Sequence, residues 1–320
     1  MSNPSAAHPG AAMTSAATVV SLPSAAWVED VGPIDGVEFV VNDLTSPLER
    51  AEQIELCVAP YMQGVDRGLF AEMPQLRFVQ VLTAGYEGLP EALPDGVDLA
   101  NAVGVHDTST AELAVALTLA ALRGIPQFVR DAQTGTWAPG GQFYDALADR
   151  HVVIVGYGDI GRAIARRLEP FEVSIEAVAS RARDGDEIVE RIHGIDDLGS
   201  LLGNADVLII VVPLTAATEQ LIDEEVLAAL PDGAVVVNVA RGRVVDTDAV
   251  LRHASRLRFA LDVTDPEPLP SDHPLWSEPN VLISPHTGGA TTAFRPRAVR
   301  LLRRQIEEYV RTGSISHLVT

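Results

Sequence analysis

The stretch HVVIVGYGDIGRAIARRL, residues 151–168, is the part of the chain from which the fold can be inferred. Its first five residues form a strand-like run, and a helical pattern follows the glycines. The first glycine of such a turn permits a tight bend, the second lets the backbone approach a pyrophosphate, and the third lets the helix pack on the strand. The alternative is a packing turn without a ligand. We predict a dinucleotide site that includes Gly156, Gly158, Asp159, Ile160 and Gly161.

The segment after the next predicted strand, residues 173–179, indicates which dinucleotide binds. A carboxylate usually follows this strand and accepts hydrogen bonds from the ribose, but this chain has Ser180, Arg181 and Arg183. A serine can donate a hydrogen bond, and arginine pairs with phosphate. Asp184 and Asp186 lie past the arginines, too far along the chain to replace the missing carboxylate. We therefore predict NADP(H) as the preferred cofactor, with NAD(H) as the alternative if the arginines are only solvated surface groups.

Strand-like and helix-like segments alternate along the rest of the chain, as in a doubly wound α/β fold. Continuous β-branched runs are typical of buried parallel strands, and they occur at residues 17–22, 37–41, 54–60, 76–82, 205–213, 234–240 and 257–263. Helical patterns occur at residues 108–125, 223–230, 246–254 and 291–313. The last helix should end at Gly313, and its expected apolar face comprises Ala298, Leu301, Leu302, Ile306 and Val310.

Length and composition exclude several classes of protein. The chain has 320 residues, enough for two domains, and a net charge of −21 with no long basic run, so we expect no nucleic-acid partner. No segment approaches the ~18 apolar residues of a membrane span, so we expect no membrane partner. Residues 1–16 lack a basic region followed by an apolar run, and we interpret them as a disordered tail rather than a signal peptide.

Cysteine and lysine usage narrows the chemistry further. The only cysteine, Cys57, cannot form an intramolecular disulfide, which favours a cytoplasmic location. It lies in an apolar run and is expected to be a buried strand residue. All 23 basic side chains are arginines, so mechanisms that need a catalytic lysine are excluded. No metal site is predicted.

Three segments of the second half carry polar residues near the ends of predicted strands, and such ends face the cofactor crevice. They are VVVNVARGRVVD with Arg241, ALDVTDPEPLP with Asp262 and Glu267, and NVLISPHTGGAT with His286. Hydride transfer to a ketone needs a cation for the substrate, an acid for the developing alkoxide and a partner that orients the acid. Arginine, histidine and glutamate supply these groups. Each residue alone could equally be a helix cap, a surface group or a loop charge.

The order of motifs resembles the D-2-hydroxyacid dehydrogenase family, which includes glyoxylate/hydroxypyruvate reductases. The similarity spans residues 75–312 and is carried by LTAGYEGL, TAELAVALTLAALR, VGYGDIG, VVPLTAAT, NVARGRVVD, ALDVTDPEPLP and SPHTGG. The resemblance implies two Rossmann-like doubly wound domains. A cofactor domain, residues 106–287, would be inserted into a discontinuous substrate-binding domain made of residues 17–105 and 288–320.

The resemblance also implies roles for individual residues. Arg241 would bind the substrate carboxylate, and His286 would act as acid/base with Glu267 as its partner. Backbone groups at Ala84 and Gly85 would help to hold the substrate. Further cofactor contacts are expected at Pro213, Thr218, Ala240, Asp262 and Gly288. A homodimer is also implied, with the helix that opens at Thr108 and the loop before His151 as candidate contacts.

The expected function is NADPH-dependent reduction of a small 2-keto acid, of the glyoxylate or hydroxypyruvate type, to the D-2-hydroxy acid. NAD-dependent relatives carry aspartate where this chain has Ala179, and many members have an aromatic residue in place of Thr264. One alternative is a corepressor-like protein that senses dinucleotides with little turnover. Another is a short NAD-dependent 3-phosphoglycerate dehydrogenase, since no regulatory domain follows the last predicted helix.

Overall fold

The computed structural model describes residues 17–137 and 143–319, which form two compact units. The first unit extends to Ala102 and resumes at Val299, and the second comprises Val103–Ala298. The predicted division assigned residues 103–105 and the segment 288–298 to the first unit, whereas in the structure they belong to the second. A hydrogen bond of 2.7 Å between Ser109 and Thr291 and a stack of His106 on Phe294 attach this segment to the second unit. The predicted tail, residues 1–16, lies outside the described residues.

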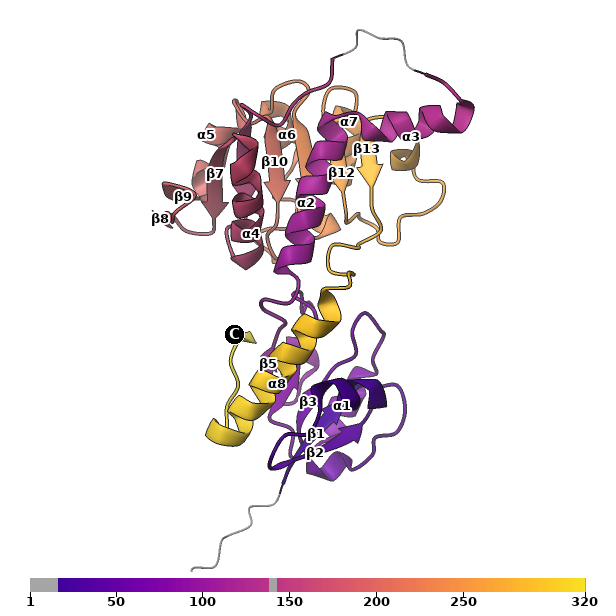
Figure 1. Cartoon of the computed structure of the whole chain (residues 1–320), viewed down its shortest axis with the longest axis vertical. Helices are drawn as coiled ribbons and strands as arrows, with labels where there is room; N and C mark the ends of the chain where they lie inside the picture. Colours follow the sequence, from indigo (N-terminus) through magenta and orange to yellow (C-terminus); the bar gives the residue numbers. More distant parts are fainter. Residues whose placement is uncertain (1–16, 138–142, 320) are drawn as a thin grey trace, which may run out of the picture. The chain divides into compact units, whose positions relative to one another are not determined.

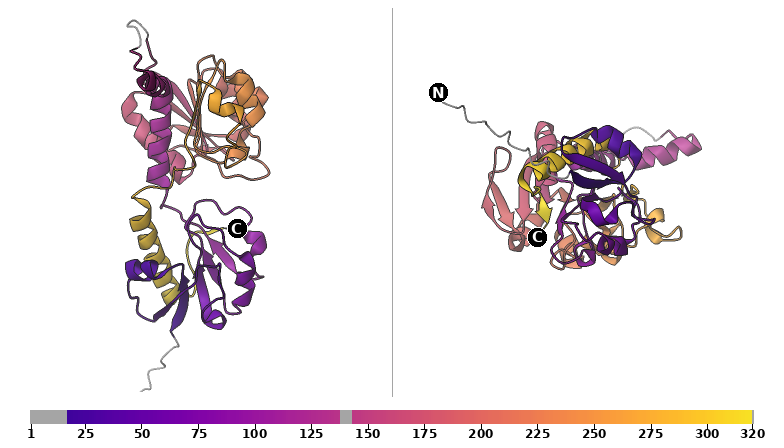
Figure 2. Two further views of the ribbon diagram at one scale, coloured as in Figure 1. Left: turned by 90° about the vertical axis from the view of Figure 1, so that its right-hand side faces the viewer. Right: turned by 90° about the horizontal axis from the view of Figure 1, so that it is seen from below.

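The first unit is built on a six-stranded sheet (Figures 1 and 2). Its strands are β1 (Thr18–Leu22), β2 (Val37–Val41), β3 (Ile54–Val58), β4 (Phe78–Gln80), β5 (Asp98–Ala100) and β14 (Leu318–Val319). Their order is β14-β5-β4-β3-β1-β2, and only the β14–β5 pair is antiparallel. Its helical segments are α1 (Ala25–Val31), η1 (Ala51–Gln53), η2 (Arg67–Glu72), η3 (Pro90–Ala92) and most of α8 (Phe294–Thr312). Cys57 lies fully buried in β3 as expected, and burial raises the pKa of its thiol to about 12.

Helix α8 buries most of its predicted face. Ala298, Leu301, Leu302 and Ile306 are buried, but Val310 is 41% exposed, so that prediction was wrong. Tyr309 is buried in its place, and its hydroxyl donates to Glu55 at 2.8 Å. Position 309 continues the three- and four-residue spacing of the stripe, and position 310 lies at its edge. The helix ends before Gly313, as predicted, where φ is +75°.

The second unit is built on an eight-stranded sheet. Its strands are β6 (His151–Val155), β7 (Ser174–Ala179), β8 (Arg183–Asp184), β9 (Arg191–Gly194), β10 (Val207–Ile210), β11 (Val235–Asn238), β12 (Arg258–Leu261) and β13 (Val281–Ile283). Their order is β13-β12-β11-β10-β6-β7-β9-β8, and only β8 runs antiparallel to its neighbour. The chain moves outward from β6 in both directions, which creates the switch point where such sheets bind ligands.

Helices cover both faces of this sheet. They are α2 (Asp107–Leu122), α3 (Ile125–Thr134), α4 (Asp159–Leu168), α5 (Leu198–Leu202), α6 (Glu224–Ala229) and α7 (Thr247–His253), with η4 (Glu169–Phe171), η5 (Ile195–Asp197), η6 (Gly242–Val244) and η7 (Pro274–Ser277). Figure 1 shows α2 and α4 side by side, and Figure 2 shows α7, in orange, on the opposite face. Val152 and Ile154 belong to the core under α2 and α4, whereas Val153 and Val155 belong to the core under α6 and α7. The strands are therefore apolar on both sides, as their continuous runs predicted.

Helix α2 is mostly buried, and α3 follows it after a bend. Gly124, with φ of +66°, separates the two helices, and Ile125, Phe128 and Val129 of α3 are exposed. Within residues 17–137 and 143–319, no single helix is long and apolar enough to cross a membrane. Helices α2 and α3 taken together meet the criterion of length and composition, but they are bent by 64° at the break between them.

Candidate active site

The glycine turn after β6 has the geometry that its spacing predicts. Gly156 has φ of +109°, and a Cβ atom there would lie 2.5 Å from the carbonyl oxygen of Val211. A Cβ atom on Gly161 would lie 2.1 Å from the carbonyl oxygen of Gly156, so a larger residue would separate α4 from the turn. Gly158 faces open space, with no atom within 4 Å of a Cβ position. The turn therefore leaves its backbone accessible at the N-terminus of α4, where a pyrophosphate can be held.

The first residues of α4 complete this turn. Asp159 is exposed at the start of the helix, and Ile160 packs against the core under α2 and α4. Asp159 and Asp107, at the start of α2, line one pocket, so the two helices begin close to each other. Burial and then the charge of Asp159 raise the pKa of Asp107. The backbone N–H groups of this first turn are the donors that a pyrophosphate would use.

The segment after β7 carries the three predicted phosphate ligands. Ser180, Arg181 and Arg183 are exposed. The Arg183 guanidinium donates to the carbonyl oxygen of Tyr157, in the glycine turn, at 2.7 Å. The turn and the arginine segment thus meet, although 26 residues separate the two partners in sequence. Glu176, the nearest carboxylate within β7, is engaged elsewhere, because His193 of β9 lies 2.8 Å from it.

The loops after β11, β12 and β13 carry the predicted catalytic residues. These strands are parallel neighbours, so their carboxyl ends lie at one edge of the sheet. His286 Nδ1 and Glu267 Oε1 lie 2.5 Å apart, and the two side chains are 32% and 40% exposed. When Nδ1 carries a proton it donates to Glu267, which orients the ring and leaves Nε2 for another partner. The pair has the arrangement of a proton donor and its orienting carboxylate.

The loop that carries His286 is held by Asp262. His286 adopts a φ of +51°, and its backbone N–H donates to the carbonyl oxygen of Asp262 at 2.7 Å. The buried Asp262 carboxylate accepts from Ser284 Oγ at 2.6 Å and from the N–H groups of Thr287 and Gly288, each at 2.8 Å. A Cβ atom on Gly288 would lie 3.0 Å from this carboxylate. Asp262 and Gly288, both predicted cofactor contacts, therefore lie together and support the strained histidine.

Arg241 follows β11 on a turn that Asn238 stabilises. The buried Asn238 side chain donates to the Arg241 carbonyl oxygen and accepts from the Ala240 N–H, both at 3.0 Å. The Arg241 guanidinium donates to the Ala240 carbonyl oxygen at 2.7 Å. A Cβ atom on Gly242 would lie 1.9 Å from the Thr264 carbonyl oxygen, so the turn packs directly on the loop that leads to Glu267. The loop that carries Arg241 is therefore in contact with the loop that carries Glu267, the partner of His286.

Two further predicted segments form ordered turns. After β10, Thr218 Oγ1 donates to the Pro213 carbonyl oxygen at 2.6 Å, which closes a turn at the same edge of the sheet. In the first unit, Ala84 and Gly85 follow β4. Their carbonyl oxygens accept from Asn101 Nδ2 at 2.9 Å and from Thr83 Oγ1 at 2.6 Å.

Asn238 and Ser284 were not among the residues predicted from the sequence. The available signal was a polar residue at or just after the end of an apolar strand, as in VVVN and VLIS. That pattern is common, and the partners of these side chains became evident only in the folded chain.

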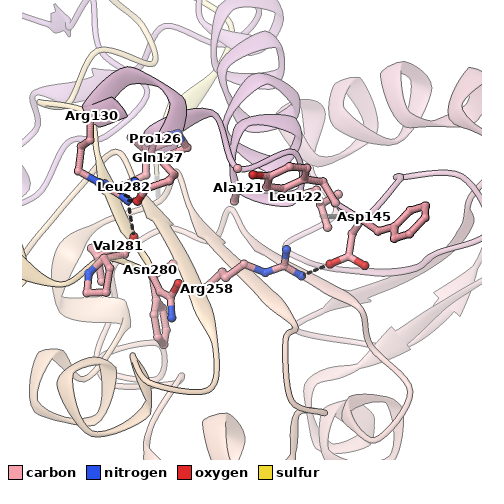
Figure 3. A pocket seen from close by; sticks show the side chains of 15 residues that line it. Ala121, Leu122, Pro126, Gln127, Arg130, Asp145, Arg258, Asn280, Val281 and Leu282 are labelled. Atoms are coloured by element: carbon pink, nitrogen blue, oxygen red, sulfur yellow. Dashed lines mark hydrogen bonds and ion pairs between the residues drawn. The ribbon is translucent and has the colours of Figure 1, made fainter. Parts of the chain in front are cut away.

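A cavity of about 360 Å³ lies elsewhere in the second unit (Figure 3). Residues at the end of α2 and from α3, β12 and β13 line it, and Figure 3 shows Arg258 paired with Asp145 at its wall, at 2.8 Å. None of the predicted catalytic or cofactor residues lines this cavity. In the described part of the chain, no group of three or more His, Cys, Asp or Glu side chains could hold a metal ion.

Comparison with known proteins agrees with this geometry. Residues 115–288 match the family model "D-isomer specific 2-hydroxyacid dehydrogenase, NAD binding domain". The glyoxylate reductase of Thermofilum pendens is 34% identical over 251 residues, which cover 76% of this chain and 74% of that protein. The enzyme of the same name from Thermococcus onnurineus is 33% identical and covers 81% and 80%.

Solved structures show the same fold over nearly the whole chain. A D-isomer specific 2-hydroxyacid dehydrogenase from Xanthobacter autotrophicus, in complex with NADPH and MES, has a TM-score of 0.79 at 26% identity and covers 96% of this chain and 98% of that one. An NADPH-dependent glyoxylate/hydroxypyruvate reductase from Sinorhizobium meliloti, in complex with citrate, has a TM-score of 0.78 at 27% identity and covers 94% and 97%. The chain therefore belongs to the D-isomer specific 2-hydroxyacid dehydrogenase family, and it is an oxidoreductase that acts on CH–OH donors.

Proposed function

We propose that this protein reduces a small 2-keto acid, of the glyoxylate or hydroxypyruvate type, to the D-2-hydroxy acid with NADPH. The observation that carries the proposal is the 2.5 Å contact between His286 Nδ1 and Glu267 Oε1, on loops that pack against the Arg241 turn. A cation, an acid and an orienting carboxylate are the groups that carbonyl reduction requires. The names of the two glyoxylate reductases support the substrate class.

In this mechanism Arg241 binds the substrate carboxylate and polarises the keto oxygen. The reduced nicotinamide, when bound, supplies a hydride to the keto carbon. His286 transfers its proton to the developing alkoxide, and the carbonyl becomes a hydroxyl. Glu267 stabilises the imidazolium before the transfer and keeps the ring oriented. We further propose that the backbone at Ala84 and Gly85 contacts the substrate, and that the protein works as a homodimer.

Preference for NADPH is supported by the chemistry of the segment after β7. A dinucleotide fits the turn because Gly158 leaves the N-terminus of α4 open. Ser180, Arg181 and Arg183 then offer exposed donors where a ribose 2′-phosphate would be recognised, and none of the three is a carboxylate that would repel it. Two structural relatives support the same preference: the Xanthobacter autotrophicus dehydrogenase was solved in complex with NADPH, and the Sinorhizobium meliloti reductase is NADPH-dependent.

The test is a comparison of initial rates with NADPH and with NADH, using glyoxylate, hydroxypyruvate and larger 2-keto acids. We expect turnover with a small 2-keto acid and a higher kcat/KM with NADPH. Tight NADPH binding without turnover would indicate a dinucleotide-sensing protein instead. If NADH is the preferred cofactor and 3-phosphohydroxypyruvate the preferred substrate, the protein is a short 3-phosphoglycerate dehydrogenase.

A further inference from the structure

The antiparallel hairpin at the edge of the larger sheet follows the arginine segment directly. It consists of β8, β9 and the turn between them, residues 183–194, and we call it the β8–β9 hairpin. Gly185 closes this turn tightly, because a Cβ atom there would lie 1.9 Å from the Val189 carbonyl oxygen. One carboxylate oxygen of Asp186 accepts from the N–H groups of Ile188 and Val189, at 3.0 and 3.2 Å. The hairpin turn is therefore organised around the Asp186 side chain.

The same carboxylate connects the hairpin to the glycine turn. Tyr157, the residue between Gly156 and Gly158, is 2% exposed, and its hydroxyl lies 3.1 and 3.2 Å from the two oxygens of Asp186. Arg162 of α4 forms an ion pair with Asp186 at 3.2 Å. Burial and the adjacent Asp186 charge raise the pKa of Tyr157, so its hydroxyl stays protonated and donates at neutral pH. Burial opposes the charge of Asp186, but hydrogen bonds from Ile188, Val189 and Tyr157 outweigh it and lower the pKa of that carboxyl.

These contacts exclude a simpler role for Asp186 as a ribose ligand. A carboxylate has about four acceptor positions. Two backbone N–H groups, the Tyr157 hydroxyl and the Arg162 guanidinium already occupy those of Asp186. Its side chain is only 16% exposed. Asp186 is thus an internal anchor of the hairpin and not an acceptor open to the cofactor.

Tyr157 holds the hairpin at a second point, through its backbone. Its carbonyl oxygen accepts from the Arg183 guanidinium at 2.7 Å, while its hydroxyl binds Asp186 three residues further on. One residue of the glycine turn therefore restrains both the arginine and the turn of the hairpin. When a loop and an arginine are already fixed before the ligand binds, less conformational entropy is lost on binding.

We propose that Tyr157 and Asp186 are positioning residues for cofactor discrimination, which hold residues 180–183 where they can receive the 2′-phosphate. This inference rests on the proposed preference for NADPH. NADH has no 2′-phosphate and gains little from an ordered arginine segment. Loss of the contact should therefore weaken the binding of NADPH and leave that of NADH almost unchanged.

The experiment measures the Kd of NADPH and of NADH by calorimetric titration of the full-length protein. Tyr157→Phe keeps the buried ring and removes only the donor, and we expect the Kd of NADPH to rise about 3- to 10-fold. The Kd of NADH should change by less than about two-fold. Asp186→Asn removes the charge of the acceptor in the same contact and should also raise the Kd of NADPH. Glu187→Gln is the matched control, because its 2.7 Å pair with Arg166 links α4 to the same hairpin but is exposed at both ends.

The wild-type protein separates this inference from the one on which it rests. Equal wild-type affinities for NADPH and NADH would contradict the proposed cofactor preference. A wild-type preference for NADPH that both variants retain would overturn the role of Tyr157 and Asp186 and leave the proposed function intact. Equal weakening of both cofactors would also overturn it, because it would mean that the contact supports only the glycine turn.

Discussion

The two ends of the larger sheet present their polar side chains in different ways. At the β11–β13 end, His286 contacts Glu267 directly, and the loops around them are joined by hydrogen bonds. At the β7–β9 end, Arg181 and Arg183 are exposed, and Arg183 is held through a backbone carbonyl. Proton transfer needs protein groups in one fixed orientation, so the fold itself supplies their partners. Recognition of a phosphate needs donors that remain open until the ligand arrives.

Substitution of His286 tests the catalytic end with the largest expected effect. His286→Ala should lower kcat by about 10²- to 10⁴-fold, because the proton donor is lost. The Kd of NADPH should stay within about two-fold, since the glycine turn is untouched. His151→Ala is the control, because this histidine pairs with Ser174 at the opposite end of the strands. Unchanged kcat in His286→Ala, measured from initial rates, would refute the acid/base role.

Arg241→Ala removes the cation of the same end. We expect kcat/KM to fall by about 10²-fold, with a higher KM and a lower kcat, because the guanidinium both binds the carboxylate and polarises the keto group. The neighbouring Arg243→Ala should have little effect, since Arg243 is exposed and paired with Glu219. If steady-state kinetics show a larger loss of kcat/KM in Arg243→Ala than in Arg241→Ala, the substrate carboxylate is bound by a cation other than Arg241.

Substitutions at the β7–β9 end should change the affinity for NADPH and leave the rate of the chemical step unchanged. The double variant Arg181→Ala/Arg183→Ala should raise the KM for NADPH about 10- to 100-fold, because two charge-assisted contacts are lost. Its kcat and its KM for NADH should change by less than about two-fold. Arg252→Ala, an exposed arginine of α7 paired with Glu224, serves as the control. A parallel loss with NADH would show that the two arginines do not read the 2′-phosphate.

Ser284→Ala tests how far the fixed geometry of the catalytic end depends on its supporting hydrogen bonds. It removes the 2.6 Å bond to Asp262 without touching His286 or Glu267. We expect kcat to fall about 3- to 10-fold, because the loop of His286 loses one hydrogen bond to the Asp262 carboxylate and keeps the others. Ser277→Ala, which loses an exposed bond to a backbone carbonyl, should be neutral. If both variants match the wild type in initial rates, the loop holds His286 without Ser284.

Several elements were not predicted, for reasons that are local. β5 is three residues long and begins with an exposed aspartate, so it has no strand pattern of its own and depends on pairing with β4 and β14. α3 leaves Phe128 and Val129 exposed, so its apolar residues do not mark a buried face. β8 has only two residues and is defined by its pairing with β9. Such segments are defined by the neighbours that they pair with or pack against, and they carry no clear pattern of their own.

The sequence by itself determined two kinds of element: the strands that are buried on both faces and the glycine turn. Strands buried on both faces must be apolar throughout, and a turn that meets a pyrophosphate must place glycine where a Cβ atom would clash or block, so both are visible in the order of residues. The spacing of residues left the partner of His286 open, and only the family resemblance implied Glu267, 19 residues away. The contact between Tyr157 and Asp186, 29 residues apart, was decided by the tertiary structure alone. These pairs depend on strand order and on the tightness of two loops. A carboxylate in a loop looks the same in the sequence whether it faces solvent, a histidine or a tyrosine, because its partner is chosen by the fold.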